Sequence, residues 1–387
     1  MKITDIMFSH LRNALFGTEA DEQTAQKTIE CADTLYKLSK HHDVAHLVSY
    51  AIEKNKIQLP VTELSKKFRK RHPIAVIRYE AMDAVYTQLC ETLENEKIPF
   101  VPLKGSVIRK LYPEPWMRTS CDIDILVREE DLENTVLLLT EKYGFEKSQE
   151  GTHEISLYSK SGIHIELHYR LHEDFYKSSA DEILKCVWSM AEPVSDGSYM
   201  YELNDELFYF YHVYHMAKHF EVGGCGIRPF IDMWLLNHNV SYNGEKRDEL
   251  LEKGGIKKFE ESCRALSEYW FSETEKTELV KSLEEYILAG GVYGVSSNSV
   301  AIRQSKSGGK VKYVLERLFL PYDMLKVHYP VLNKHKYLTP VFEVVRWFRL
   351  LSPATLRRSK REMELGNSVS DAKSEKLKSL LMDIGLK

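Results

Sequence analysis

Three short segments of the chain carry residue types that can hold a metal ion and phosphate groups. They are residues 104–106, 122–124 and 165–168, with the sequences Lys-Gly-Ser, Asp-Ile-Asp and Ile-Glu-Leu-His. Residues two apart in a β-strand share a face, so Asp122 and Asp124 would direct their carboxylates to one spot. Like charges held so close repel, and a hard divalent cation with oxygen ligands relieves that repulsion. The pattern predicts a Mg²⁺ site.

Glu166 would supply a third carboxylate if its strand lies beside the strand of Asp122 and Asp124. Apolar and polar residues alternate over 163–168, so that one face is apolar and the other carries His164, Glu166 and His168. Three carboxylates would then converge on the same site.

Gly105 and Ser106 follow a predicted strand and open a short helix, a place where a phosphate can bind. Glycine lets the backbone approach a ligand closely, and the free N–H groups at a helix start favour phosphate. Lys104 and Arg118 flank this segment. Each either neutralises phosphate charge, Arg118 through its bidentate fork, or serves as an ordinary structural cation.

The elements that would position these residues follow from hydrophobic periodicity. A helical period from about residue 5 to 95 predicts an N-terminal helical region. An apolar segment with prolines at 99–103 and the run at 122–127 predict two strands, followed by a helix whose apolar face includes Leu132 and Val136 and which stops at Gly144. Residues 153–159 and 163–168 predict an antiparallel hairpin.

The helical period returns after about residue 175 and is strongest at 205–219 and 229–237. We therefore expect an α+β fold in which a small mixed β-sheet core, residues 96–175, is flanked by helical regions. Residues 1–95 form the first, residues 176–300 close a nucleotide cleft, and residues 301–387 hold a basic connector at 303–312, C-terminal helices and a charged tail. The apolar segment 341–351 either lies on a membrane surface or, as we prefer, packs in a core or between domains.

These motifs together resemble the nucleotidyltransferase fold superfamily, the polymerase-β-like group with a Gly-Ser turn, a D-x-D strand and a later strand carboxylate. More closely, L-K-G-S, R-x-x-x-D-I-D-I-L-V, I-E-L-H and H-M-A-K-H-F followed by G-I-R-P-F-I-D are similar to an uncharacterised bacterial nucleotidyltransferase family, over about residues 75–240. The resemblance implies that Gly105 and Ser106 hold phosphate, that Asp122 and Asp124 bind metal, and that Glu166 is a metal ligand or general base.

Two features depart from the superfamily pattern. The interval from Gly105 to Asp122 is longer than usual, which leaves room for an insertion around residues 112–118. The third carboxylate is a glutamate where many members have aspartate, and its longer side chain suits a single-metal site or a different reach.

A second group of candidates lies on the later helices. His212, His215 and His219 share one helix face, and two histidines with a carboxylate can bind zinc or iron, as in a metallohydrolase. Neighbouring aromatics favour a different prediction, in which this helix packs on the sheet and presents His215, Lys218 or His219 to the nucleotide. Arg228 and Asp232 form a local salt bridge or face the cleft, and the resemblance favours the cleft.

The expected function is Mg²⁺-dependent transfer of a nucleoside monophosphate from a nucleoside triphosphate, ATP by default, to an unknown acceptor, with release of pyrophosphate. Asp122, Asp124 and Glu166 would be the catalytic and metal-binding residues, with Glu166 helping to deprotonate the acceptor. Alternatives are transfer of the γ-phosphate and a catalytically inactive module that binds nucleotide or a partner protein.

Composition sets the broad class of protein. Hydrophobic residues make up 43% and charged residues 28% of the chain, which is ordinary globular usage. With 53 basic and 57 acidic side chains the net charge is −4, which argues against a long nucleic acid and leaves a small molecule, peptide or protein as the acceptor, with RNA still open. Six scattered cysteines without a C-x-x-C pair, no export signal and no long apolar run predict a cytoplasmic protein without a transmembrane segment.

Overall fold

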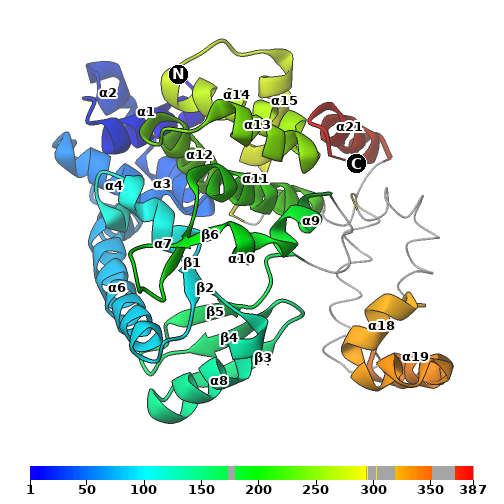
Figure 1. Cartoon of the computed structure of the whole chain (residues 1–387). Helices are drawn as coiled ribbons and strands as arrows, with labels where there is room; N and C mark the ends of the chain where they lie inside the picture. Colours follow the sequence, from blue (N-terminus) through cyan, green and yellow to red (C-terminus); the bar gives the residue numbers. More distant parts are fainter. Residues whose placement is uncertain (173–178, 293, 295–301, 303–318, 351–370, 387) are drawn as a thin grey trace.

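The computed structural model describes residues 1–172, 179–292, 294, 302, 319–350 and 371–386. Over these residues the protein has the predicted α+β fold, in which helices surround a five-stranded mixed sheet (Figure 1). A smaller sheet pairs β6 (Ala191–Pro193) with β7 (Tyr201–Leu203). None of the described helices combines the length and the apolar character needed to cross a bilayer.

The predicted N-terminal helices are present and do not stand apart from the rest of the protein. Phe8 of the first helix stacks on Trp270 near the end of α14 (Lys257–Ser272), with 4.7 Å between ring centroids, so the two regions share one apolar core. The helices are α1 (Ile3–Phe16), α2 (Glu22–Glu30), α3 (Ala32–His41), α4 (Ala45–Lys54), α5 (Glu63–Arg69) and α6 (Arg71–Asn95).

The large sheet has the strand order β1-β2-β5-β4-β3. Strand β2 is antiparallel to β1 and parallel to β5, and β5, β4 and β3 continue as antiparallel neighbours. Their bounds are β1 (Phe100–Pro102), β2 (Asp122–Val127), β3 (Glu146–Glu150), β4 (Glu154–Tyr158) and β5 (His164–His168). The predicted strands and hairpin are confirmed. Strand β3 was not predicted, because all of its side chains are exposed and none marks a buried face.

The register between β2 and β5 separates an apolar face of the sheet from a polar face. Asp122 pairs with His164 and Asp124 with Glu166, so the residues between them, such as Ile123 and Ile165, point to the opposite side. That apolar side packs against α6, against α8 (Leu132–Leu137), the helix predicted to follow β2, and against the π-helical segment Leu138–Lys142 that continues α8. The opposite, polar side carries Asp122, Asp124 and Glu166.

Within residues 179–292, the helices α9 to α15 follow the large sheet and include the two strongest predicted segments. α11 (Asp205–Glu221) and α12 (Arg228–Asn239) correspond to them. The others are α9 (Ser179–Lys185), α10 (Val187–Met190), α13 (Gly244–Lys253), α14 (Lys257–Ser272) and α15 (Glu278–Ala289). The buried apolar residues of α11 and α12 belong to the same core as those of the N-terminal helices.

The last part of the chain contains α18 (Tyr322–His328), α19 (Thr339–Leu350) and α21 (Asp371–Asp383). In α19, the ring of Phe342 packs against Tyr329 in a tilted arrangement, with 4.8 Å between ring centroids, which agrees with the packing prediction for this residue. The opposite side of the same helix departs from that prediction, because Val341, Val344, Val345 and Phe348 are exposed. The connector at 303–312 and residues 351–370 lie outside the described residues.

Candidate active site

The polar face of the sheet brings the three predicted carboxylates together. Asp122 and Asp124 come from β2 and Glu166 comes from the adjacent parallel strand β5. Donor atoms of Asp122, Glu166 and His164 lie within 4.8 Å of one another, and those of Asp124, Glu166 and His168 form a second such group. Either group can surround a small cation with oxygen and nitrogen ligands.

Lys104 lies among these carboxylates. Its Nζ is 2.7 Å from Oδ1 of Asp124 and 3.9 Å from Oε2 of Glu166. The side chain is only 19% exposed, and its backbone has a φ of 45°, in the region that disfavours L residues. The connection between β1 and α7 (Gly105–Ile108) therefore directs the ammonium group into the acidic face instead of toward solvent.

The charges around the site set its protonation states. Burial raises the pKa of Asp122, and the nearby charges of Asp124 and Glu166 raise it further. Burial acts in the same sense on Asp124, but the charge of Lys104 and a hydrogen bond from His168 outweigh it and hold the pKa of Asp124 well below its usual range. Asp124 is therefore the firmly ionised carboxylate, paired with Lys104.

His168 and Glu154 extend the cluster across the sheet, and sequence reasoning missed Glu154. Nε2 of His168 is 2.9 Å from Oδ1 of Asp124, and Nδ1 is 3.5 Å from Oε2 of Glu154. A further 3.4 Å contact joins Glu154 to His153 and helps to lower the pKa of Glu154 to about 2. The hairpin that contains Glu154 was predicted, but its register was not, and only the structure pairs Glu154 with His168.

The turn predicted to bind phosphate is held by contacts within the protein. The Ser106 amide donates to the carbonyl oxygen of Leu103 at 3.2 Å, and Nε of Arg109 donates to the carbonyl oxygen of Gly105 at 2.9 Å. A Cβ at position 105 would overlap the guanidinium of Arg118. The packing of Arg118 is therefore one structural reason for glycine at this position.

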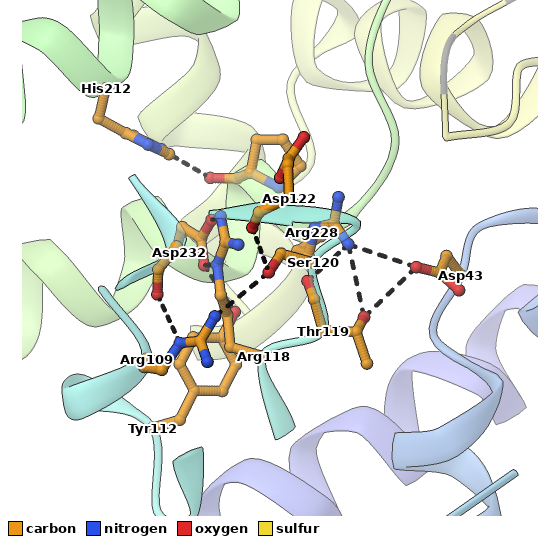
Figure 2. A network of polar contacts seen from close by, with 12 residues as sticks. Asp43, Arg109, Tyr112, Arg118, Thr119, Ser120, Asp122, His212, Arg228 and Asp232 are labelled. Carbon is orange, nitrogen blue, oxygen red and sulfur yellow. Dashed lines mark hydrogen bonds and ion pairs between the residues drawn. The ribbon is translucent and has the colours of Figure 1, made fainter. Parts of the chain in front are cut away.

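Arg118 and Arg228 have partners that differ from a local Arg228–Asp232 salt bridge (Figure 2). Asp232 pairs with Arg118, with 2.9 Å between Nη2 and Oδ2, and accepts a 2.7 Å hydrogen bond from the Tyr112 hydroxyl. Arg228 instead donates to the carbonyl oxygen of Thr119 at 2.7 Å.

Asp43, from the turn between α3 and α4, also approaches this network. Its carboxylate lies 3.3 Å from Nη1 of Arg228 and 3.3 Å from the Thr119 hydroxyl. Sequence reasoning missed Asp43, because nothing near residue 43 in the sequence indicates that its turn reaches the segment before β2. The N-terminal helices therefore contribute directly to the surroundings of the site.

Helix α11 lies close enough to the acidic face for its side chains to interact electrostatically with it. Burial raises the pKa of Tyr211, which also interacts with Lys104 and Asp124. Burial lowers the pKa of His215 well below its usual value, and the charge of Lys104 lowers it further. Burial likewise lowers the pKa of His219 to about 4. Both imidazoles are neutral near pH 7 and can act as hydrogen-bonding groups.

The three predicted histidines of α11 do not form one metal centre. Nε2 of His212 donates to the carbonyl oxygen of Pro229 at 3.0 Å, whereas His215 and His219 pack edge to face at 4.5 Å. Across the described part of the chain, the groups whose donor atoms can surround a metal include none of these histidines. Lys218 of the same helix places its ammonium 5.7 Å from the ring centroid of Tyr214.

Comparison with known proteins adds one finding. A family model described as an uncharacterised nucleotidyltransferase matches residues 30–272, more than half of the chain. The matched range contains the carboxylates, Lys104, the Gly-Ser turn and the arginine network. The comparisons with curated proteins and with solved structures found no match.

Proposed function

The chain belongs to this uncharacterised nucleotidyltransferase family, and from that premise we propose that it transfers a nucleoside monophosphate from a nucleoside triphosphate, ATP by default, to an acceptor with release of pyrophosphate. The observation that supports this proposal most directly is the parallel register that pairs Asp124 with Glu166 and leaves Asp122 on the same face. Nucleotidyl transfer needs carboxylates that hold a metal ion next to the phosphates of the nucleotide. The polar face of this sheet carries three such carboxylates.

The carboxylates fit the metal that this chemistry requires. Asp122, Asp124 and Glu166 offer the hard oxygen ligands that Mg²⁺ prefers, and their donor atoms fall within the two close groups described above. When bound, Mg²⁺ would neutralise phosphate charge and polarise the phosphorus centre. His164 and His168 are the nearest nitrogen donors.

The remaining roles follow from exposure and charge. Glu166 is more exposed than Asp124, with 20% against 4% of the side chain accessible, so it is the carboxylate that we propose takes the proton of the acceptor. Gly105 and Ser106, with Lys104, are proposed to hold phosphate. His215, Lys218 and His219 of α11 are proposed to contact the nucleotide.

We propose that three residues position the strand that carries the site without touching the metal: Arg118, Arg228 and Asp232. The guanidinium of Arg118 is paired with Asp232. Arg228 donates a hydrogen bond to the carbonyl oxygen of Thr119, three residues before Asp122. These contacts position the start of β2. In this arrangement residues 176–300 would form the helical domain that closes the cleft over the core at 96–175.

The acceptor is proposed to be a small molecule, a peptide or a protein in the cytoplasm. A net charge of −4 does not favour a long nucleic acid. Mass spectrometry of acceptors labelled in host lysate with a pool of nucleotides would identify the acceptor class.

Purified protein tests the proposed reaction. With Mg²⁺ and ATP the melting temperature should rise, and turnover should release pyrophosphate, whereas release of a nucleoside diphosphate would identify γ-phosphate transfer. Asp122→Ala should abolish both the shift and the pyrophosphate, while Asp196→Ala, at an exposed position, should leave both intact. A shift that persists in Asp122→Ala would contradict the assigned metal site.

A second candidate is a nucleotide-binding module without catalysis. The position of Lys104 favours it, because an ammonium group among the carboxylates supplies positive charge without a metal. This candidate predicts nucleotide binding with no turnover for any acceptor tested.

A further inference from the structure

We propose that Lys104 is a built-in cation of the ligand-free site, which a divalent metal must displace and which then moves onto the triphosphate. Metal alone would bind weakly, and removing the Lys104 charge would strengthen its binding. The inference rests on the proposed function only in taking this site to bind a metal–nucleotide complex.

The geometry supports displacement. Nζ of Lys104 lies 2.7 Å from Asp124 and 3.9 Å from Glu166, and these two residues also form one of the groups able to surround a metal. The ammonium and a metal ion would therefore compete for the same two carboxylates. Nε2 of His168 also lies 2.9 Å from Oδ1 of Asp124 and would keep this carboxylate oriented when the ammonium leaves.

The charge balance favours the same conclusion. Asp122, Asp124 and Glu166 place three carboxylates on one face, and Lys104 compensates part of their charge. A divalent ion added beside the ammonium would be repelled by it at short range. The ammonium is the group free to leave, because it ends a flexible four-carbon stem, whereas the carboxylates are on paired strands.

Once displaced, the ammonium needs another anion, since a half-buried charge without a partner is costly. The triphosphate of the metal–nucleotide complex would supply that anion to the Lys104 ammonium. Metal and nucleotide should therefore bind cooperatively through Lys104, and by linkage each should raise the affinity for the other by the same factor.

Calorimetric titration of Mn²⁺ into the purified full chain tests this inference. Without nucleotide, Lys104→Met should bind Mn²⁺ about tenfold tighter than wild type, because its competitor is gone. In wild type, α,β-methylene-ATP should raise the affinity for Mn²⁺. In Lys104→Met the factor by which it does so should be about tenfold smaller, because the phosphates have lost their ammonium partner. Lys110→Met removes a lysine charge at an exposed position and should match wild type in both titrations.

Equal or weaker Mn²⁺ binding by nucleotide-free Lys104→Met would overturn the proposal. If Lys104→Met does not fold, Lys104→Gln, which also removes the charge but keeps amide protons for Asp124, carries the same prediction. Should both require a cation to fold, Mn²⁺ should restore the near-ultraviolet circular dichroism of each. Failure of Mn²⁺ to restore it would contradict the replacement of Lys104 by metal.

The inference and the proposed function fail separately. Tighter Mn²⁺ binding by Lys104→Met, with no pyrophosphate formed by wild type, would keep the built-in cation and reject the transferase. Pyrophosphate formed by wild type, with unchanged Mn²⁺ binding by Lys104→Met, would keep the transferase and reject the built-in cation.

Discussion

Arg118 and Asp232, 114 residues apart in the chain, form a two-point ion pair. Nη2 and Nε of the guanidinium lie 2.9 and 3.3 Å from Oδ2 and Oδ1 of the carboxylate. The two side chains are 10% and 1% exposed. The pair joins the segment that leads into β2 to helix α12, so the strand that carries Asp122 and Asp124 is tied to the helical layer beside it (Figure 2).

Asp232→Asn should strongly destabilise the protein, because it leaves the buried Arg118 charge without its partner. Breaking one side of such a pair costs about 3–5 kcal/mol. Urea unfolding measures the loss. Lys66→Met is the control, since Lys66 and Glu63 form an exposed pair and such pairs contribute roughly 0–1 kcal/mol. Equal effects of the two substitutions would mean that the Arg118–Asp232 pair does not stabilise the fold.

Gly105→Ala should also destabilise, because its methyl group would overlap the Arg118 guanidinium and force it away from Asp232. Overpacking of this kind costs about 1–3 kcal/mol. Gly244→Ala is the matched control, since no atom lies within 4 Å of the added Cβ and the residue begins α13. Thermal unfolding compares the two variants. A neutral Gly105→Ala would leave phosphate approach as the reason for glycine there.

His10 should make stability depend on pH below neutrality. Burial lowers its pKa from 6.5 to about 4 in the folded state. Thr28 donates its hydroxyl proton to the Thr24 carbonyl, so Nε2 of His10 must donate to Thr28. Protonation would place a second N–H on Nδ1, which is buried and has no hydrogen-bond partner among the described residues, and this disfavours the charged imidazole. Between pH 6.5 and 4 the unfolded chain binds a proton that the folded chain does not, and stability therefore rises with pH through this window and is complete above it.

His10→Gln tests this dependence, because glutamine does not titrate. From pH 6.5 to 5 wild type should lose about 2 kcal/mol through this histidine, and the variant should be less sensitive by that amount. Urea unfolding at both pH values measures the difference. Gln58→Ala, at an exposed position and without a titratable group, should leave the wild-type slope unchanged. An unaltered slope in His10→Gln would show that the residue is not a buried neutral histidine.

His168→Leu should weaken metal binding while the sheet stays folded. His168 orients Asp124, the proposed metal ligand, by a 2.9 Å hydrogen bond, and losing such an outer partner of a ligand typically costs about 10–100-fold in affinity. Mn²⁺ titration in the presence of α,β-methylene-ATP measures the loss. Gln149→Leu, on the exposed strand β3, should bind as wild type does. Unchanged affinity in His168→Leu would mean that Asp124 needs no support from β5.

Much of the fold could be predicted from local patterns. The alternation in residues 122–127 and 163–168 depends on the two-residue period of a strand, and both strands are present. The same alternation placed Asp122, Asp124 and Glu166 on polar faces. Strand β3 has no buried residue, so its sequence shows no alternation of apolar and polar side chains from which a strand could be predicted.

The pairing of charges could not be predicted in this way. The four-residue spacing of Arg228 and Asp232 suggested a local contact, but Asp232 pairs with Arg118 and Arg228 contacts Thr119 and Asp43. Charged side chains are long and their attraction is not directional, so spacing along one helix does not choose among several partners brought close by packing.

The sequence by itself determined the strands that carry the carboxylates, their polar faces and the family, because side-chain alternation and short motifs are local properties that each segment carries wherever it lies. Only the tertiary structure decided that β5 lies parallel to β2, that Lys104 enters the acidic face and that Arg118 is bound to Asp232. Those outcomes depend on which segments, distant along the chain, the burial of the common core brings together.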